Sequence, residues 1–229
     1  MHHPFAALLF SLVIADSAVN VAHGQLPPPI AEDTVVRVPA QQFDVTRFDS
    51  ITALSLRAIL DSAAAKGLPT RPLINLGLLG AARRAVGSRI LAVVRAHAAA
   101  MEDVKRIVGP RVSASELDAC AQAMRAGVDG GTMALLRAAR PTGPLVQPCI
   151  VVTDLIQRGV PFATANNAVL SVARLPQSDS MLDSMQSVVA KNAARGGPGM
   201  AVEALQRYLR DNVPATARAS GTRSRPPDQ

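Results

Sequence analysis

The sequence predicts an all-α fold, built from short helical hairpins that pack as an array or an irregular bundle. Hydrophobic residues make up 48% of the chain, whereas aromatic residues make up only 3% and tryptophan is absent. A composition rich in alanine and poor in aromatic residues favours closely packed helices over a β-sandwich. Apolar residues also recur at helical spacing through most of the chain.

The third observation is a junction pattern, in which a helix end is followed by glycine, an apolar residue and proline. Residues 158–161 (Arg-Gly-Val-Pro) are its best copy, and residues 65–69 and 194–198 follow it. Residues 124–129 have aspartate in the proline position, and residues 82–86 are a degenerate copy. Glycine just past a helix end adopts the left-handed conformation at low cost, and proline suits a first helical turn. The pattern therefore predicts hairpins joined by Gly-apolar-Pro junctions.

Residues 1–24 have the features of a signal peptide. An apolar run over residues 5–15 is broken only by Ser11, and Ala22 and Gly24 are small residues at the positions that a signal peptidase reads. We therefore expect cleavage before Gln25 and export to the periplasm or the extracellular space. Because the start has no Lys or Arg and Asp16 closely follows the apolar run, an uncleaved anchor or a buried helix is the alternative.

Residues 25–50 are interpreted as an extended, proline-containing arm. Three consecutive prolines at residues 27–29 form a stiff spacer, and Pro39 ends a short stretch that could form one strand. The helical-hairpin domain then spans residues 51–211. In its first helix Ile51, Leu54, Ala58 and then residues 60–63 recur at helical spacing, up to Gly67.

Two further helices are expected over residues 69–84 and 88–107. In the first, Gly77 and Gly80 would permit close contact with a neighbouring helix. The second has a buried stripe in alternating steps of four and three: Ile90, Val94, His97, Met101 and Val104. Ser113 and Glu116 then form a capping box at the start of another helix.

Residues 140–148 are the clearest internal break, either a hinge or a long loop between helices. Beyond them, helices should begin at Pro148, at Pro161, at Ser178 or Asp179, and at Pro198. The paired units are therefore residues 113–140, 148–174 and 178–211. Residues 212–229 should form a disordered basic tail.

The net charge of +7 comes mostly from arginines distributed along the chain. A soluble basic surface explains it, and the functional alternative is weak contact with a polyanion through Arg218, Arg223 and Arg225. Sugars and single-stranded nucleic acids usually stack on aromatic side chains, which are scarce here.

Residues 121–140 imitate a DNA-reading helix-turn-helix. The first positions of the would-be recognition helix are Gly130, Gly131 and Thr132, which are poor readers of base edges. An exported protein also meets no genome, so we do not expect nucleic acid as a partner. If the signal-peptide interpretation is wrong, DNA binding becomes the alternative.

His97, Cys120 and Cys149 are the residues most often found in catalytic or metal sites. His97 lies on an apolar stripe, which predicts a core histidine bonded to a backbone or neighbouring polar group. Cys120 and Cys149 lie on adjacent predicted helices of a chain that we expect in an oxidising compartment, which leaves two interpretations open: two separately buried thiols, or a disulfide between them. No spacing typical of a cofactor or metal site occurs.

Asp154 is the acidic residue most worth weighing for catalysis, because it lies in an apolar run. A hydrolase of envelope polymers would need two facing acids, one of them in an apolar pocket. The plainer interpretation of Asp154 is an ion pair with Arg158, one helical turn away.

Residues 61–69, 113–117 and 153–161 together resemble a group of exported all-helical bacterial proteins without an assigned activity. The resemblance covers residues 54–211 and rests on the helix junctions, so it implies no functional residue. We expect a non-catalytic helical interaction module of the cell envelope, which binds a protein or another envelope component.

Overall fold

The computed structural model describes residues 45–219, and all of them belong to one compact unit, Gln41–Gln229. This part of the chain is all-α, which confirms the predicted fold class. A short 3-10 helix, Val45–Arg47, precedes nine α-helices. These are α1 (Ser50–Ala65), α2 (Thr70–Ala82), α3 (Gly87–Val108), α4 (Ala114–Arg125), α5 (Gly130–Ala139), α6 (Val146–Gln157), α7 (Phe162–Ala173), α8 (Ser178–Asn212) and α9 (Ala215–Ala219).

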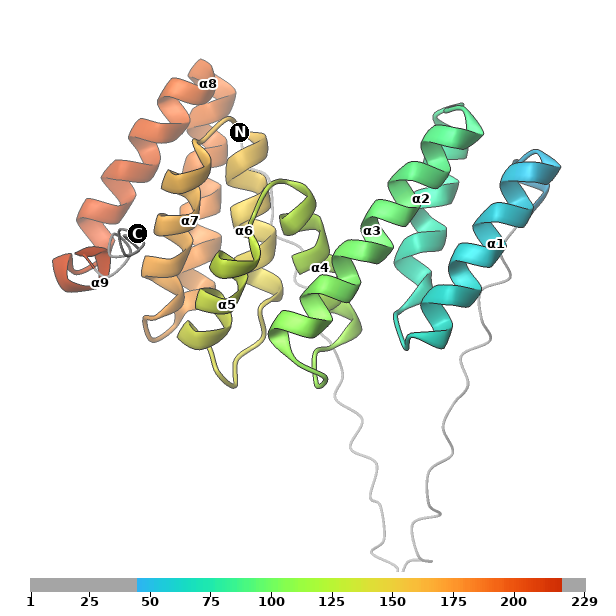
Figure 1. Ribbon diagram of the computed structural model, residues 1–229. Helices are drawn as coiled ribbons and strands as arrows, with labels where there is room; N and C mark the ends of the chain where they lie inside the picture. The colour runs from blue at the N-terminus through green and yellow to red at the C-terminus, as the bar shows by residue number, and fades with distance from the viewer. Residues whose placement is uncertain (1–44, 220–229) are drawn as a thin grey trace, which may run out of the picture. The chain divides into compact units, whose positions relative to one another are not determined.

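The helices pack in the order in which they follow one another along the chain (Figure 1). α1, α3, α5, α7 and α9 contact one another in turn, and α4, α6 and α8 do the same. α2 packs on α1 and α3. The two sets are joined where α3 packs on α4 and where α6 packs on α7. Within the described residues the fold is therefore two layers of helices around one continuous apolar core.

Four of the five junctions end their helices with one hydrogen-bond pattern. After α1, the N–H of Leu68 donates to the carbonyl of Ala63 and the N–H of Gly67 donates to that of Ala64. The same pair of bonds ends α2, α4 and α6, which is the Schellman motif. Gly67 adopts a φ of +65°, and in the degenerate second junction Arg84 adopts a φ of +54° without being glycine.

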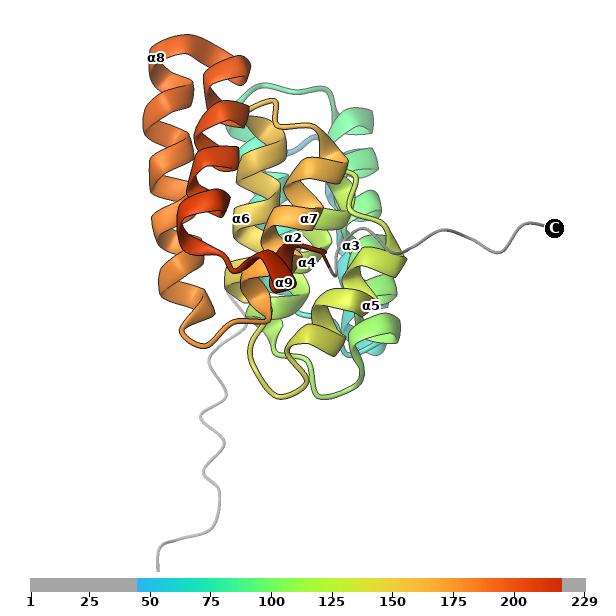
Figure 2. The same ribbon diagram turned by 90° about the vertical axis from the view of Figure 1, so that its left-hand side faces the viewer.

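The fifth junction is built differently. The Schellman bonds are replaced by a kink, at which Gly196 (φ −150°) and Gly197 (φ +71°) leave the helical conformation inside α8. Figure 2 shows that the two limbs of α8, one before and one after this kink, run side by side. The Tyr208 hydroxyl on the second limb donates to the carbonyl of Met181 on the first, at 2.8 Å. Residues 178–211 thus form a helical hairpin whose turn depends on two consecutive glycines.

Gly77 and Gly80 allow close contact with neighbouring helices. A Cβ at Gly77 would lie 2.9 Å from the Leu56 side chain of α1, and one at Gly80 would lie 2.7 Å from that of Ile90 in α3. Both distances are shorter than real Cβ contacts, so α2 approaches its neighbours as closely as it does because these residues lack side chains.

The prediction for the apolar face of α1 was wrong for Ile51, Leu54 and Ala58, and it was right for Leu60 and Ala63. Ile51 and Leu54 are 77% and 69% exposed, and the buried face consists of Thr52, Leu56, Leu60 and Ala63. Both sets have helical spacing, so periodicity alone could not choose between them. The packing partners decide it, because α2 and α3 both contact the Leu56 side of the helix.

Several boundaries also differ from the sequence-based expectation. Neither Ser178 nor Asp179 caps α8, because both lie inside the helix after Gln177, whose φ is +57°. The expected disordered tail is wrong for residues 213–219, since Val213 is buried and a short helix follows. Of residues 140–148, the expected break, residues 140–145 are a loop between α5 and α6, while α6 already begins at Val146, before Pro148, and the segment does not divide the unit.

Other expectations fall on residues that lie outside the described range. These are the signal peptide over residues 1–24, the part of the arm over residues 25–44, and the tail beyond residue 219 with Arg223 and Arg225. The described end of the arm, residues 45–47, is a 3-10 helix rather than extended. Between residues 45 and 219, every helix is too short or too polar to cross a lipid bilayer.

Candidate functional site

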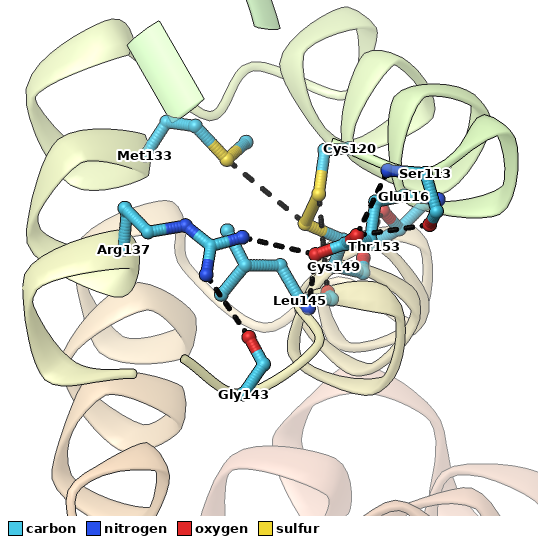
Figure 3. Close-up of a disulfide and its surroundings, with 9 residues drawn as sticks. All are labelled: Ser113, Glu116, Cys120, Met133, Arg137, Gly143, Leu145, Cys149 and Thr153. Atoms are coloured by element: carbon cyan, nitrogen blue, oxygen red, sulfur yellow. Dashed lines mark hydrogen bonds and ion pairs between the residues drawn. A yellow bond between two sulfur atoms is a disulfide. The ribbon is translucent and has the colours of Figure 1, made fainter. Parts of the chain in front are cut away.

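Cys120 and Cys149 are joined by a disulfide that links α4 to α6 (Figure 3). Their Cα atoms are 5.0 Å apart, within the usual range for a disulfide. Both side chains are fully buried, and the bridge spans α5 and the loop over residues 140–145. The link constrains α4, α5 and the loop as one closed segment.

Beside the disulfide lies a buried charged pair that the sequence analysis did not identify. Glu116 completes the capping box with Ser113, and its other carboxylate oxygen accepts hydrogen bonds from Arg137 at 2.9 Å and from the N–H of Leu145 at 3.0 Å. Arg137 also donates to the carbonyls of Arg140 and Gly143, at 2.9 and 3.0 Å. Figure 3 shows Glu116 between the two helices, facing Arg137.

These contacts set the ionisation of Glu116. Burial opposes the charged form, but hydrogen bonds from Leu145, Ser113 and Arg137 outweigh it and hold the pKa of the carboxyl below its ordinary value. Glu116 is therefore a carboxylate at neutral pH, and it compensates the guanidinium of Arg137. Its role is to hold the loop over residues 140–145 against α4.

Arg140 extends the network to α8. Its guanidinium binds both carboxylate oxygens of Asp179, at 2.5 and 3.1 Å, in a bidentate pair. Asp179 was expected to cap α8, and this ion pair is what it makes instead. A charged chain from Ser113 to Asp179 thus connects α4, α5 and α8.

His97 is fully buried in α3, and its Nε2 lies 2.9 Å from a carboxylate oxygen of Asp118 in α4. Hydrogen bonding to His97 is the main reason that the pKa of Asp118 is lowered, so Asp118 is ionised and Nε2 donates. Nδ1 is buried without a hydrogen-bond partner among the described residues. This is the core histidine with a polar neighbour that the sequence predicts.

Asp154 makes the ion pair expected from its spacing, with Arg158 Nε 2.7 Å from its carboxylate. Asp118 and Asp154 both line a groove of about 440 Å³ beside α4 and α6. Hydrolysis by acid catalysis needs a carboxyl group whose pKa is raised. In this groove Asp118 has a lowered pKa and Asp154 is bound to arginine, so the two carboxylates do not form such a pair.

The first turn of α5, which would read DNA in a helix-turn-helix, packs against its neighbours. A Cβ at Gly130 would lie 3.1 Å from Ile107 of α3, and the Thr132 hydroxyl lies 3.5 Å from the Asn166 side-chain amide of α7. A recognition helix must place this turn in the major groove. The packing of α5 therefore disfavours DNA recognition by this element.

The face of the protein that sequence reasoning missed is on α1. Ile51, Leu54 and Ala58 are exposed at spacings of three and four residues and form an apolar stripe. Next to them lies a shallow groove of about 430 Å³ between α1 and α3, with Ala58 and Ala99 in its lining. An amphipathic helix of another molecule binds to surfaces of this kind.

Comparison of the chain with protein-family models, with curated proteins and with solved structures finds no significant match. Within residues 45–219 no group of three or more His, Cys, Asp or Glu side chains is placed to hold a metal ion. The candidate functional site is therefore defined by its geometry, as the apolar stripe of α1 and the α1–α3 groove.

Proposed function

We propose that the protein is an exported, non-catalytic helical interaction module of the cell envelope, and that α1 and α3 form its binding face. The partner is a protein or another envelope component with an apolar edge. This proposal accounts for an all-helical unit whose buried polar groups tie helices together and whose most exposed apolar side chains lie at one end.

The observation that carries the proposal is the exposure of α1. Ile51 and Leu54 are the two most exposed large hydrophobic residues of the described chain. In stacked helical proteins a terminal helix needs a polar outer face to stay soluble. A terminal helix with an apolar stripe beside a groove is therefore the feature expected of a surface that a partner covers.

The disulfide supports the proposed export to an oxidising compartment. Disulfides persist in oxidising compartments and are rare where thiols are kept reduced. Cys120 and Cys149 are both within the bridge, so the described chain has no free cysteine. Export through the signal peptide over residues 1–24 would place the chain where this bridge is stable.

Site-specific photo-crosslinking in the producing cell tests the binding face. A photoreactive residue at Leu54 should crosslink to a discrete partner, whereas one at Gln206, an exposed position on the second limb of α8, should not. The substitution Ile51→Asn should then weaken the crosslink formed from position 54. Equal crosslinking from both positions, or none from position 54, would contradict the proposal.

Export is tested separately, by measuring the intact mass and the N-terminal sequence of the protein recovered from the envelope or the medium. We expect a start at Gln25 and alkylation of the cysteines only after reduction. An intact Met1 with freely alkylated cysteines in a cytosolic fraction would overturn the proposal of export.

A further inference from the structure

Four arginines line one cavity at the junction between α2 and α3. Arg83 and Arg84 come from the junction itself, Arg89 from the first turn of α3 and Arg125 from the end of α4. The cavity has a volume of about 690 Å³, which lies within the usual range of small-molecule sites.

The four arginines have no acidic partner among the described residues. Elsewhere Arg106, Arg137, Arg140 and Arg158 each form an ion pair with a carboxylate. No hydrogen bond or ion pair is made by the side chains of the four cavity arginines within residues 45–219. Other unpaired arginines lie scattered on the surface, so the distinguishing feature is that four surround one cavity.

The nearest part of α1 does not supply the missing negative charge. Asp49 lies close to Gly87, where α3 begins, but its carboxylate accepts hydrogen bonds from the N–H of Thr52 at 2.9 Å and from the Thr52 hydroxyl at 2.6 Å. It makes no ion pair with an arginine. The cavity is therefore strongly positive, and an anion would be held there by charge-assisted hydrogen bonds.

The remaining lining of the cavity is largely aliphatic. Leu79 is 46% exposed and Ile90 is buried, and both line the cavity together with Val86, which is 68% exposed at the start of α3. A bare phosphate or sulfate would leave this apolar surface in water. A ligand with an anionic head and an apolar tail would satisfy both parts of the lining.

The backbone conformation of Arg84 also favours a ligand site in this cavity. Three other junctions have glycine at the corresponding left-handed position: Gly67, Gly127 and Gly159. Arginine at this φ is strained relative to glycine, and strain of this kind concentrates at functional sites. The junction therefore keeps an arginine at the mouth of the cavity at a cost in conformational energy.

We propose that this cavity binds an anionic amphiphile, with a phosphate or carboxylate head on the arginines and an apolar tail on Leu79, Val86 and Ile90. The inference goes beyond the proposed function, and it names the chemical class of one ligand. It concerns a surface distinct from the α1–α3 groove, so the two can be tested apart.

Titration calorimetry of the full chain with a short-chain phosphatidic acid, at concentrations where the lipid stays monomeric, tests the proposal. Arg84→Gly and Arg89→Gln should each weaken binding about tenfold, because each removes a charge-assisted hydrogen bond. Arg84→Gly also relieves the backbone, so its loss of binding cannot result from unfolding. Arg207→Gln, at an exposed arginine of α8, is the matched control and should leave the affinity unchanged.

Three comparison ligands separate the sources of the affinity. Short-chain phosphatidylcholine should bind at least tenfold more weakly, and equal binding would show an apolar pocket only. Inorganic phosphate should also bind at least tenfold more weakly, and equal binding would overturn the role of the tail. Vesicles of phosphatidic acid should compete with the monomeric lipid, and binding to vesicles alone would show attachment to a surface rather than this cavity.

Absence of binding to every ligand, or an equal loss in the Arg207→Gln control, would likewise overturn the inference. Crosslinking from position 54 does not depend on these arginines. If the lipid does not bind but position 54 still crosslinks, only the lipid site is overturned. If the lipid binds as expected but position 54 does not crosslink, only the proposed function is overturned.

Discussion

The two ends of the helical unit are stabilised by different means. From α4 to α8, a disulfide and a chain of partly buried ion pairs connect the helices with the loop over residues 140–145. From α1 to α3, apolar packing and glycine contacts hold the helices, and the ion pair between Lys66 and Glu102 is exposed. The exposed stripe of α1 lies at this second end, and so do Arg83, Arg84 and Arg89 of the cavity, whereas Arg125 comes from the end of α4.

The difference indicates that the two ends of this fold have different roles. Buried polar networks and disulfides fix a single arrangement, and surfaces that bind partners are drawn from parts with fewer such links. We infer that α4–α8 form the rigid support and that α1–α3 present the binding surfaces. Each prediction below changes one end and leaves the other as its internal control.

The largest effect is expected from removing the disulfide. In Cys120→Ala/Cys149→Ala, a closed loop of 29 residues is opened, which should lower the free energy of unfolding by about 3.5 kcal/mol. Urea unfolding followed by circular dichroism measures the change. Reduction of the native protein should reproduce it, and a change below about 1 kcal/mol would show that the bridge does not hold this end.

Paired substitutions on α1 test which face is buried. Leu56→Ala should cost about 3 kcal/mol, because the side chain is fully buried against α2. Leu54→Ala, two residues away and exposed, should change stability by less than about 0.5 kcal/mol. Equal losses in the two variants would mean that Leu54 is covered in solution.

Replacing Glu116 should weaken the polar network. Glu116→Gln leaves Arg137 without its counter-charge and should cost about 2 to 3 kcal/mol, less than a fully buried pair because Arg137 is 23% exposed. Urea unfolding at pH 7 measures the loss. Asp103→Asn, which breaks an exposed pair with Arg106, is the matched control and should cost less than about 0.5 kcal/mol.

The lowered pKa of Glu116 also predicts how the stability of the protein falls at acid pH. Because the pKa of Glu116 is lowered in the folded state, its contribution is complete above the ordinary value of 4.5 and is lost as the pH falls through the folded pKa. Stability measured from pH 7 down to pH 3 should therefore decline less steeply in Glu116→Gln than in the native chain. Parallel declines would contradict the assigned ionisation.

The smallest effect is expected at Arg84 and has the opposite sign. Arg84→Gly should raise stability by up to about 1 kcal/mol, because glycine adopts the left-handed conformation without strain. Thermal unfolding checks this. Gly127→Ala, at the equivalent position after α4, should destabilise by a similar amount, and a loss of stability in Arg84→Gly would show that its side chain supports the fold.

Sequence patterns predicted the helices well, because caps and junctions are local. Ser113 and Glu116 form the capping box that their spacing indicates, and the Schellman bonds recur at the glycine junctions. The stripe on α3 is buried from Ile90 to Val104, as its period requires. These features depend on residues within a few positions of one another.

The candidate site was not predictable, because it depends on which helix lies at the end of the unit. The stripe from Ile51 to Ala58 has the spacing of a core face, and only the position of α2 and α3 shows that it is exposed. The arginine cavity combines residues 83–89 with Arg125 of α4, which are distant in sequence. An available signal was arginine at residue 84, where the other junctions have glycine.

Amide hydrogen exchange of the full chain tests the contrast between the two ends most directly, in the oxidised protein, after reduction, and with short-chain phosphatidic acid. Reduction should speed exchange in α4–α6 and leave α1–α2 unchanged, whereas the lipid should slow exchange at the α2–α3 junction and leave α6–α8 unchanged. Equal deprotection of both ends on reduction, or protection by the lipid confined to α6–α8, would contradict a rigid support joined to a separate binding end.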